Sequence, residues 1–208
     1  LHVGLPAIAS NLIVPLSTAL VTALISSYGQ TAVAAYGLAG RLEAFIIVIL
    51  MALGGAIAPY VGQNFGAKRF DRLEEGFKFS MRFILVYSVF CIVFLYFSAE
   101  FFLGFFTADP EVIKIAKMQL LYCPWGYGFL GVAAICNGSF NAFGKPMPAM
   151  TISIARTLVV YVPMAYLFAS FIGIRGIFVA QVVANILAGI AGIIWYRLLF
   201  RQLSNQNT

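Results

Sequence analysis

Charged side chains are rare in this chain. Asp, Glu, Lys and Arg fill only 10% of its 208 positions, whereas they fill roughly 25% of an ordinary soluble domain. Hydrophobic residues fill 62%, which is more apolar surface than a water-soluble protein of this size can bury. The composition therefore excludes an ordinary soluble domain and predicts a chain whose outer surface contacts lipid.

Residues that carry enzymatic or metal chemistry are also scarce. The chain has one histidine, His2, and three widely spaced cysteines, Cys91, Cys123 and Cys136. It contains no HExxH, GxSxG or GxxxxGK[ST] motif, the signatures of zinc proteases, serine hydrolases and P-loop nucleotide-binding proteins. We therefore predict that the chain is not an enzyme, holds no metal site and needs no cofactor.

Long apolar runs, by contrast, are abundant. Six stretches lack Asp, Glu, Lys and Arg, and each approaches or exceeds the ~17 to 25 residues that a helix needs to cross a membrane. They are residues 1–40, 44–67, 83–99, 118–144, 157–174 and 176–196. The sequence predicts an all-α polytopic membrane protein, with one six-helix bundle over residues 1–208. The predicted helices are Pro6–Ser27, Thr31–Gln63, Glu75–Glu100, Glu111–Phe143, Pro148–Ile172 and Ile177–Phe200.

Basic residues near the helix ends predict the orientation. Eight fall between spans two and three, between spans four and five, or after span six: Lys68, Arg69, Arg72, Lys78, Arg82, Lys145, Arg197 and Arg201. Only Lys114, Lys117 and Arg175 fall in the opposite loops. By the positive-inside rule, we predict that the protein lies in the plasma (inner) membrane with both termini of this segment on the cytoplasmic side. No concentrated soluble basic face is present, so we expect no nucleic-acid partner.

Two ionisable residues fall deep inside the second span. Arg41 lies about 15 Å along a helix that starts near Thr31, close to the middle of a membrane. Glu43 is two positions further on, so the two side chains diverge and each needs a cavity or a partner elsewhere. One hypothesis makes Glu43 an ion-coupling group that Arg41 tunes. The alternative is that both satisfy polar groups of neighbouring spans and fix helix packing.

Polar and aromatic side chains also gather in the fourth span. Tyr127, Asn137 and Asn141, together with Tyr36 of the second span, are candidates for the wall of a substrate cavity. The alternative is a packing seam in which the asparagines form hydrogen bonds between helices. Arg156, eight residues into the fifth span, is expected to reach the cytoplasmic interface and anchor the helix there.

Four runs carry a resemblance to a known family. They are Leu5-Pro6, Arg41 to Phe45 (RLEAF), Ala58 to Ala67 (APYVGQNFGA) and Asn137 to Met150 (NGSFNAFGKPMPAM). Each stands in the expected order on the six spans, and together they resemble the second six-helix half of the multidrug and toxic compound extrusion family. Within the third run, Gly62, Gln63, Asn64 and Gly66 are expected to form a break or tight turn between spans.

The resemblance implies a twelve-helix transporter of two lobes, in which this chain supplies helices seven to twelve and the first lobe is missing. Such proteins export drugs or lipophilic, cationic compounds by alternating access in exchange for Na+ or H+, the coupling ion. Many members carry an acid in the first and fourth helices of this half. Pro6–Ser27 contains none, so the resemblance also implies that the coupling acid can lie in the first lobe.

Two other functions remain open. A lipid-linked oligosaccharide flippase of the same superfamily shares the architecture, although such cavities are lined with Arg and Lys, and here Arg41 is the clearly deep basic residue. A membrane assembly module without transport activity is the second alternative. Small-molecule substrates, the lipid bilayer and the first lobe are the expected partners.

Overall fold

The computed structural model describes residues 4–205, with side chains from Pro15 onward, and every element among them is helical. The side chains of Leu5 and Pro6 lie outside the described residues. The elements are α1 (Gly4–Ser26), α2 (Gln30–Gly66), α3 (Phe70–Gly104), α4 (Pro110–Tyr122), η1 (Cys123–Gly126), α5 (Tyr127–Ala142), α6 (Pro146–Ile154), η2 (Ala155–Tyr161), α7 (Val162–Ile172) and α8 (Ile174–Asn205). The six predicted spans are confirmed, each within several residues of its predicted bounds.

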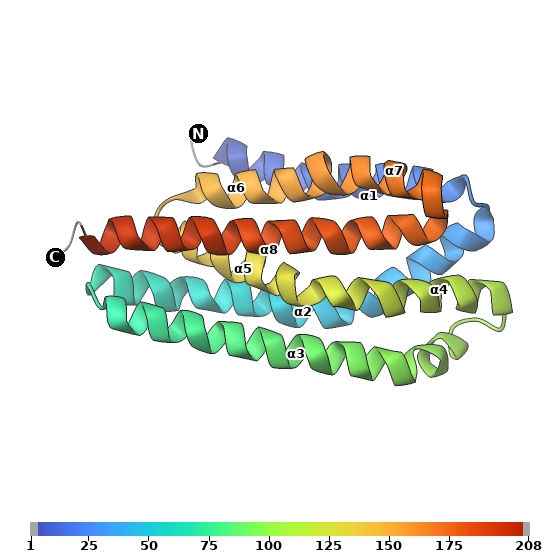
Figure 1. The fold of residues 1–208 in the computed structure, drawn as a ribbon, viewed down its shortest axis with the longest axis horizontal. Helices are drawn as coiled ribbons and strands as arrows, with labels where there is room; N and C mark the ends of the chain where they lie inside the picture. The colour runs from blue at the N-terminus through green and yellow to red at the C-terminus, as the bar shows by residue number, and fades with distance from the viewer. Residues whose placement is uncertain (1–3, 206–208) are drawn as a thin grey trace.

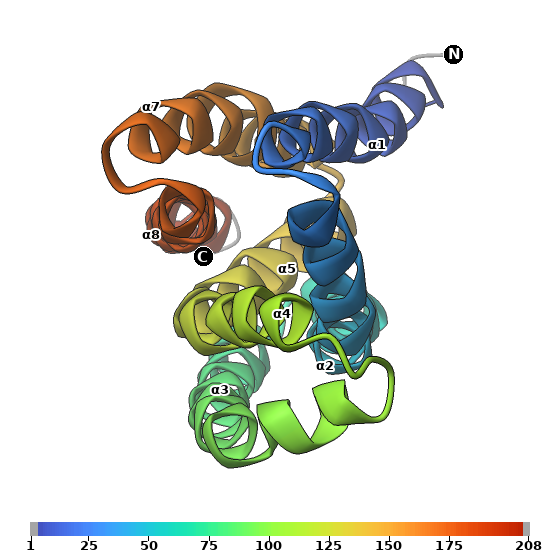
Figure 2. The ribbon, with the colours of Figure 1, turned by 90° about the vertical axis from the view of Figure 1, so that its right-hand side faces the viewer.

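The helices run back and forth along the long axis of the molecule, so that the N-terminal end of α1 and the C-terminal end of α8 meet at the same end (Figure 1). Viewed along that axis, α1, α7 and α8 lie on one side and α2, α3 and α4 on the other, with α5 between them (Figure 2). The most extensive helix contacts are those of α5 with α2 and with α8. The fourth span is therefore the centre of the bundle.

Five helical segments are long and apolar enough to cross a membrane: Gln30–Gly66, Phe70–Gly104, Pro110–Ala142, Pro146–Ile172 and Ile174–Asn205. Helix α1 adds a sixth apolar segment. Large hydrophobic side chains are exposed along the outside, as on α3, where Val86 is 70% exposed and Phe97 is 79% exposed. Because such a surface is stable in contact with lipid and not with water, the chain is a multi-pass membrane protein.

Small residues let the central helices approach closely. A methyl group added at Gly54 of α2 would lie 2.9 Å from the carbonyl oxygen of Ala134 on α5, and one added at Gly138 would collide with the backbone of Gly54. At the turn into α8, Gly176 lies directly against the backbone of Phe168. At these three positions glycine permits a close helix contact, as small residues do in membrane proteins.

Two spans are irregular near their middle. The fourth span tightens into the 3₁₀ turn η1, whose second residue is Pro124. The fifth span widens into the π-helix η2, and Pro163 follows it at the start of α7. Proline cannot donate the helical hydrogen bond and its ring displaces the preceding turn, so each irregularity has a local cause. Both lie next to polar side chains described below.

The predicted break at Gly62, Gln63, Asn64 and Gly66 is wrong, because α2 continues through all four residues. The chain turns instead at residues 67–69, where the carbonyls of Gln63, Asn64 and Phe65 accept hydrogen bonds from the turn. The residue in the left-handed region is Lys68, with φ of 58°. The backbone N–H groups of residues 67–69 donate hydrogen bonds to carbonyls in the last turn of α2. The helix therefore extends to Gly66, and Gly62 and Gly66 do not adopt a positive φ.

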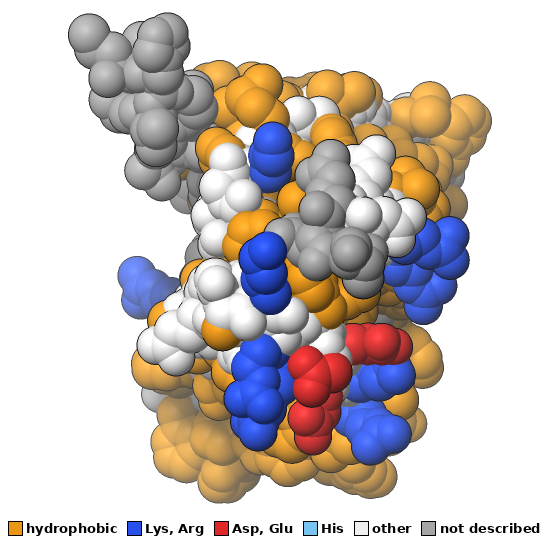
Figure 3. Space-filling model, turned by 90° about the vertical axis from the view of Figure 1, so that its left-hand side faces the viewer, with side chains coloured by type: hydrophobic (Ala, Val, Ile, Leu, Met, Phe, Trp, Pro, Cys, Tyr) orange, Lys and Arg blue, Asp and Glu red, His pale blue; other side chains and the backbone are white. Residues whose placement is uncertain are grey.

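The charges segregate by end. The turn at residues 67–69, the α5–α6 connection and the end of α8 lie at one end of the bundle (Figure 1), which we call the basic end. Figure 3 shows Lys and Arg side chains gathered there, with a few acidic ones among them. At the opposite end, Lys117 of α4 forms an ion pair of 2.5 Å with Glu100 of α3. Glu74 and Lys78, one turn apart on α3, form an ion pair of 2.7 Å.

Candidate functional site

The most unusual polar group is the carboxylate of Glu43. It comes from the middle of α2, is 6% exposed, and neighbours the side chains of Tyr127, Gln119 and Cys123. These neighbours lie on α5, α4 and η1. Among residues 15–205, no group forms a hydrogen bond with Glu43 Oε1, Gln119 Oε1 or Tyr127 Oη. A buried acceptor oxygen without a donor is costly, so a proton or cation bound at Glu43 would stabilise this cluster of polar groups.

More polar groups extend this cluster toward α8 and η2. The Cys123 thiol donates a hydrogen bond of 3.6 Å to Gln181 Oε1 of α8. Tyr36, about two helical turns before Glu43 on α2, is a close neighbour of Tyr161 at the end of η2. The polar groups therefore form a continuous band through the centre of the lobe rather than an isolated carboxylate.

Arg156 belongs to the same region. Its Nη1 donates a hydrogen bond of 3.0 Å to Asn185 Oδ1 of α8, and Asn185 is 1% exposed. The prediction that Arg156 reaches the membrane interface is therefore wrong. Because η2 rotates the fifth span at this point, the guanidinium turns inward and finds an amide on α8.

Arg41 behaves differently from Glu43. Its side chain is exposed, and it forms no ion pair with any residue in the described part of the chain. It lies on a face of α2 that no helix of this lobe covers, in a row of exposed positions that includes Gly37, Ala44, Val48 and Gly55. The two residues point in different directions, as their spacing predicts.

The candidate cavity residues separate into three environments. Tyr127 is fully buried beside Glu43, and Tyr36 packs inward against the core. Asn137 Nδ2 donates a hydrogen bond of 3.3 Å to Ser153 Oγ on α6, as the packing alternative predicts. Asn141, one turn later, is exposed near the basic end. Of the four, the structure brings Tyr127 and Tyr36 to the polar band.

The sequence analysis missed Gln119, Gln181 and Asn185. Each is an uncharged amide inside a span. The prediction was based on charged residues and on one group of polar and aromatic residues that did not include them. Their signal was available, since polar amides are uncommon at membrane depth and usually bond to other helices. No three His, Cys, Asp or Glu side chains converge in a metal-binding group within residues 15–205.

Comparison with known proteins decides the family. The model of the MatE family matches residues 6–167, which is most of the chain. The chain belongs to the MatE family. Two of the four sequence runs that resemble the family contain Glu43, in the second span, and Asn137, in the fourth.

Individual relatives agree. The FAD transporter of Shewanella oneidensis is 33% identical over 190 residues, which make up 91% of this chain and 42% of that protein. A probable multidrug resistance protein of Bacillus subtilis, YoeA, is 28% identical over 82% of this chain and 37% of its own length. The first relative is named as a transporter and the second as a multidrug resistance protein.

The fold agrees as well. The crystal structure of the MATE transporter VcmN of Vibrio cholerae in its bent form superposes with a TM-score of 0.91 and 33% identity, over 97% of this chain and 46% of VcmN. A multidrug resistance MATE transporter solved in an inward-facing conformation gives the same TM-score at 22% identity. The chain thus spans less than half the length of the relatives that it matches.

Proposed function

We propose that this chain is the second six-helix lobe, helices seven to twelve, of a secondary active efflux transporter. The proposal is supported by family membership, by relatives about twice as long that are named as transporters, and by an open face on α2. That face presents Gly37, Ala44 and Gly55, small residues of the kind that allow another helix to approach closely. In this proposal, the first lobe packs against this face, or the face lines a substrate cavity between the lobes. Arg41 lies on the same face.

Coupling to an ion rests on one observation, the buried Glu43 carboxylate whose Oε1 has no partner. Its pocket supplies one carboxyl group, the Tyr127 phenol and the Gln119 amide oxygen. Such a set can hold a proton in a hydrogen bond or a small cation by its oxygen atoms. Na+ or H+ bound at Glu43 is the coupling ion of the proposal, and no other cofactor is required.

The orientation in the proposal places the basic end in the cytoplasm. Eight basic residues lie at or near that end of the bundle and three near the other, which is the bias of cytoplasmic loops. Both termini of this segment then lie on the cytoplasmic side of the plasma (inner) membrane. Substrate would leave through the opposite end.

The substrates of the proposal are drugs or lipophilic, cationic compounds. A second candidate is a flavin nucleotide, because one relative that is 33% identical is named an FAD transporter and the exposed Arg41 offers a cation to an anionic substrate. The lipid-linked oligosaccharide flippase and the non-transporting assembly module stay as alternatives. They predict different results in one assay.

That assay places the full-length protein in proteoliposomes with imposed Na+ or H+ gradients. Export is expected when one gradient is present and absent when both are collapsed, with a fluorescent cation and FAD tested separately. Uptake of a fluorescent polyprenyl-pyrophosphate sugar without an ion gradient would support the flippase. No movement of any probe by a folded protein would support the assembly module and contradict the proposal.

A further inference from the structure

A groove opens between α3 and α8 at the basic end, outside the polar band around Glu43. Its volume is about 520 Å³. Aromatic rings form its floor, where Phe77 of α3 stacks on Tyr196 of α8 with ring centres 4.1 Å apart. Phe200, one turn further along α8, continues this floor. Rigid rings therefore form the floor of the groove.

Four basic side chains surround the groove: Lys78 and Arg82 from α3, and Arg197 and Arg201 from α8. Glu74 is the one acidic residue that lines it, and its carboxylate is bound to Lys78 at 2.7 Å. Arg82, Arg197 and Arg201 form no ion pair with any side chain in residues 15–205. Three guanidinium groups thus remain free to bind an anion.

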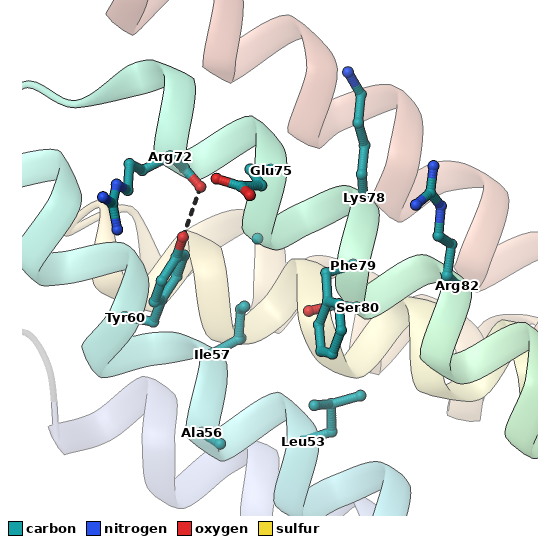
Figure 4. A pocket seen from close by; sticks show the side chains of 11 residues that line it. Leu53, Ala56, Ile57, Tyr60, Arg72, Glu75, Lys78, Phe79, Ser80 and Arg82 are labelled. Carbon is teal, nitrogen blue, oxygen red and sulfur yellow. Dashed lines mark hydrogen bonds between the residues drawn. The ribbon is translucent and has the colours of Figure 1, made fainter.

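The two α3 cations lie on the same face of their helix. Figure 4 shows Lys78 and Arg82 extending side by side, away from the hydroxyl of Tyr60, which donates a hydrogen bond to the Arg72 carbonyl. They are one turn apart on α3, and the pair also borders a second pocket, between α2 and α3. Lys78 and Arg82 therefore bring positive charge to the α3–α8 groove and to the α2–α3 pocket.

The surface beyond the charges is apolar. Further along α3, Leu85 is 65% exposed and Val89 is 53% exposed, while on α8 Ile194 is 55% exposed. A ligand in the groove therefore meets guanidinium groups at one end and hydrocarbon-facing side chains at the other. A free phosphate ion would use only the first of these features.

We infer that the α3–α8 groove binds an anionic phospholipid, with its phosphodiester on Arg82, Arg197 and Arg201 and its acyl chains along α3. Guanidinium groups bind phosphate oxygens through paired N–H donors, which a lysine cannot reproduce. Basic pockets between membrane helices attract anionic headgroups in general. The guanidinium groups match the phosphodiester of such a lipid, and the aromatic floor and the apolar surface beyond it match the acyl chains.

The test is native mass spectrometry of the full-length protein with phosphatidylglycerol and phosphatidylcholine supplied together. The unmodified protein is expected to retain phosphatidylglycerol in preference. The double variant Arg197→Gln/Arg201→Gln should bind phosphatidylglycerol roughly tenfold more weakly and lose the preference. Arg197→Lys/Arg201→Lys should recover it in part.

The matched control is Lys68→Gln/Arg69→Gln, which removes two exposed cations from the same end but outside the groove. It should keep the preference. Equal loss in both double variants would mean that general surface charge attracts the lipid, and equal retention of both lipids by the unmodified protein would also overturn the site. If the α8 double variant fails to fold, Arg82→Gln gives the same comparison from α3, and an unchanged preference there contradicts the inference.

Discussion

Glu43 and Arg41 lie two residues apart on α2 and face opposite environments. The Glu43 side chain is 6% exposed and points toward Gln119 and Tyr127, whereas the Arg41 side chain is exposed on the uncovered face of the helix. Successive residues of an α-helix turn by about 100°, so these two diverge by about 200°. The two charges can therefore serve different purposes, one inside the helix bundle and one on its exposed surface.

Replacing Glu43 with Gln is expected to abolish ion-driven export while the protein stays folded. Gln keeps the size and one acceptor of the side chain but cannot exchange a proton or attract a cation. The measurement is gradient-driven transport in proteoliposomes, with the melting temperature in detergent recorded alongside. Glu111→Gln, which changes an exposed carboxylate at the opposite end, is the control and should transport normally.

A different pattern would favour the structural alternative for Glu43. If Glu43→Gln transports at the normal rate but the protein melts at a lower temperature, the carboxylate fixes packing and does not couple ions. Normal transport together with normal stability would remove Glu43 from both hypotheses.

Asn137 and Asn141 should respond differently to alanine. Asn137 bonds to Ser153 across a helix contact, so Asn137→Ala should lower stability by about 0.6 kcal/mol, as such bonds do in membrane proteins. Asn141 is exposed, and Asn141→Ala should leave stability unchanged and alter the relative export of different substrates. Thermal unfolding and a substrate panel separate the two effects. Identical substrate profiles in Asn141→Ala and the unmodified protein would exclude contact with those substrates.

The sequence was sufficient for the spans and insufficient for the polar band, for physical reasons. The spans follow from where charges are absent, since each charge at membrane depth is costly. Glu43 and Tyr127 could be named because each is unusual by itself. That they meet with Gln119 depends on how α2 crosses α4 and α5, which no local pattern specifies. The inward direction of the Arg156 side chain depends on η2, the π-helix that precedes Pro163. The sequence alone does not determine whether such a proline produces a kink or a π-helix.

Asn185 is expected to matter more for stability than its neutral side chain suggests. Its Oδ1 accepts the hydrogen bond from Arg156 at 3.0 Å, so Asn185→Leu would leave a largely buried guanidinium without this acceptor. Losing one partner of a buried charged hydrogen bond costs about 1 to 3 kcal/mol. Thermal unfolding of Asn185→Leu, Arg156→Leu and the double variant tests the coupling. The double variant should lose less than the sum of the two single losses, and simple additivity would show that the pair does not interact.

Two adjacent glycines on α2 give a sharp test of the central helix contact. Gly54→Ala would place a methyl group 2.9 Å from the Ala134 carbonyl oxygen, whereas Gly55→Ala meets no atom within 4 Å. Overpacking of this kind typically costs about 1 to 3 kcal/mol, while alanine in an open helical position gains up to ~1 kcal/mol over glycine. Gly54→Ala should therefore unfold at a lower temperature than the unmodified protein and Gly55→Ala at the same or a higher one. The opposite order would mean that α2 and α5 are further apart than the structure places them. A loss of transport in Gly55→Ala without a loss of stability would instead indicate that the first lobe contacts this face.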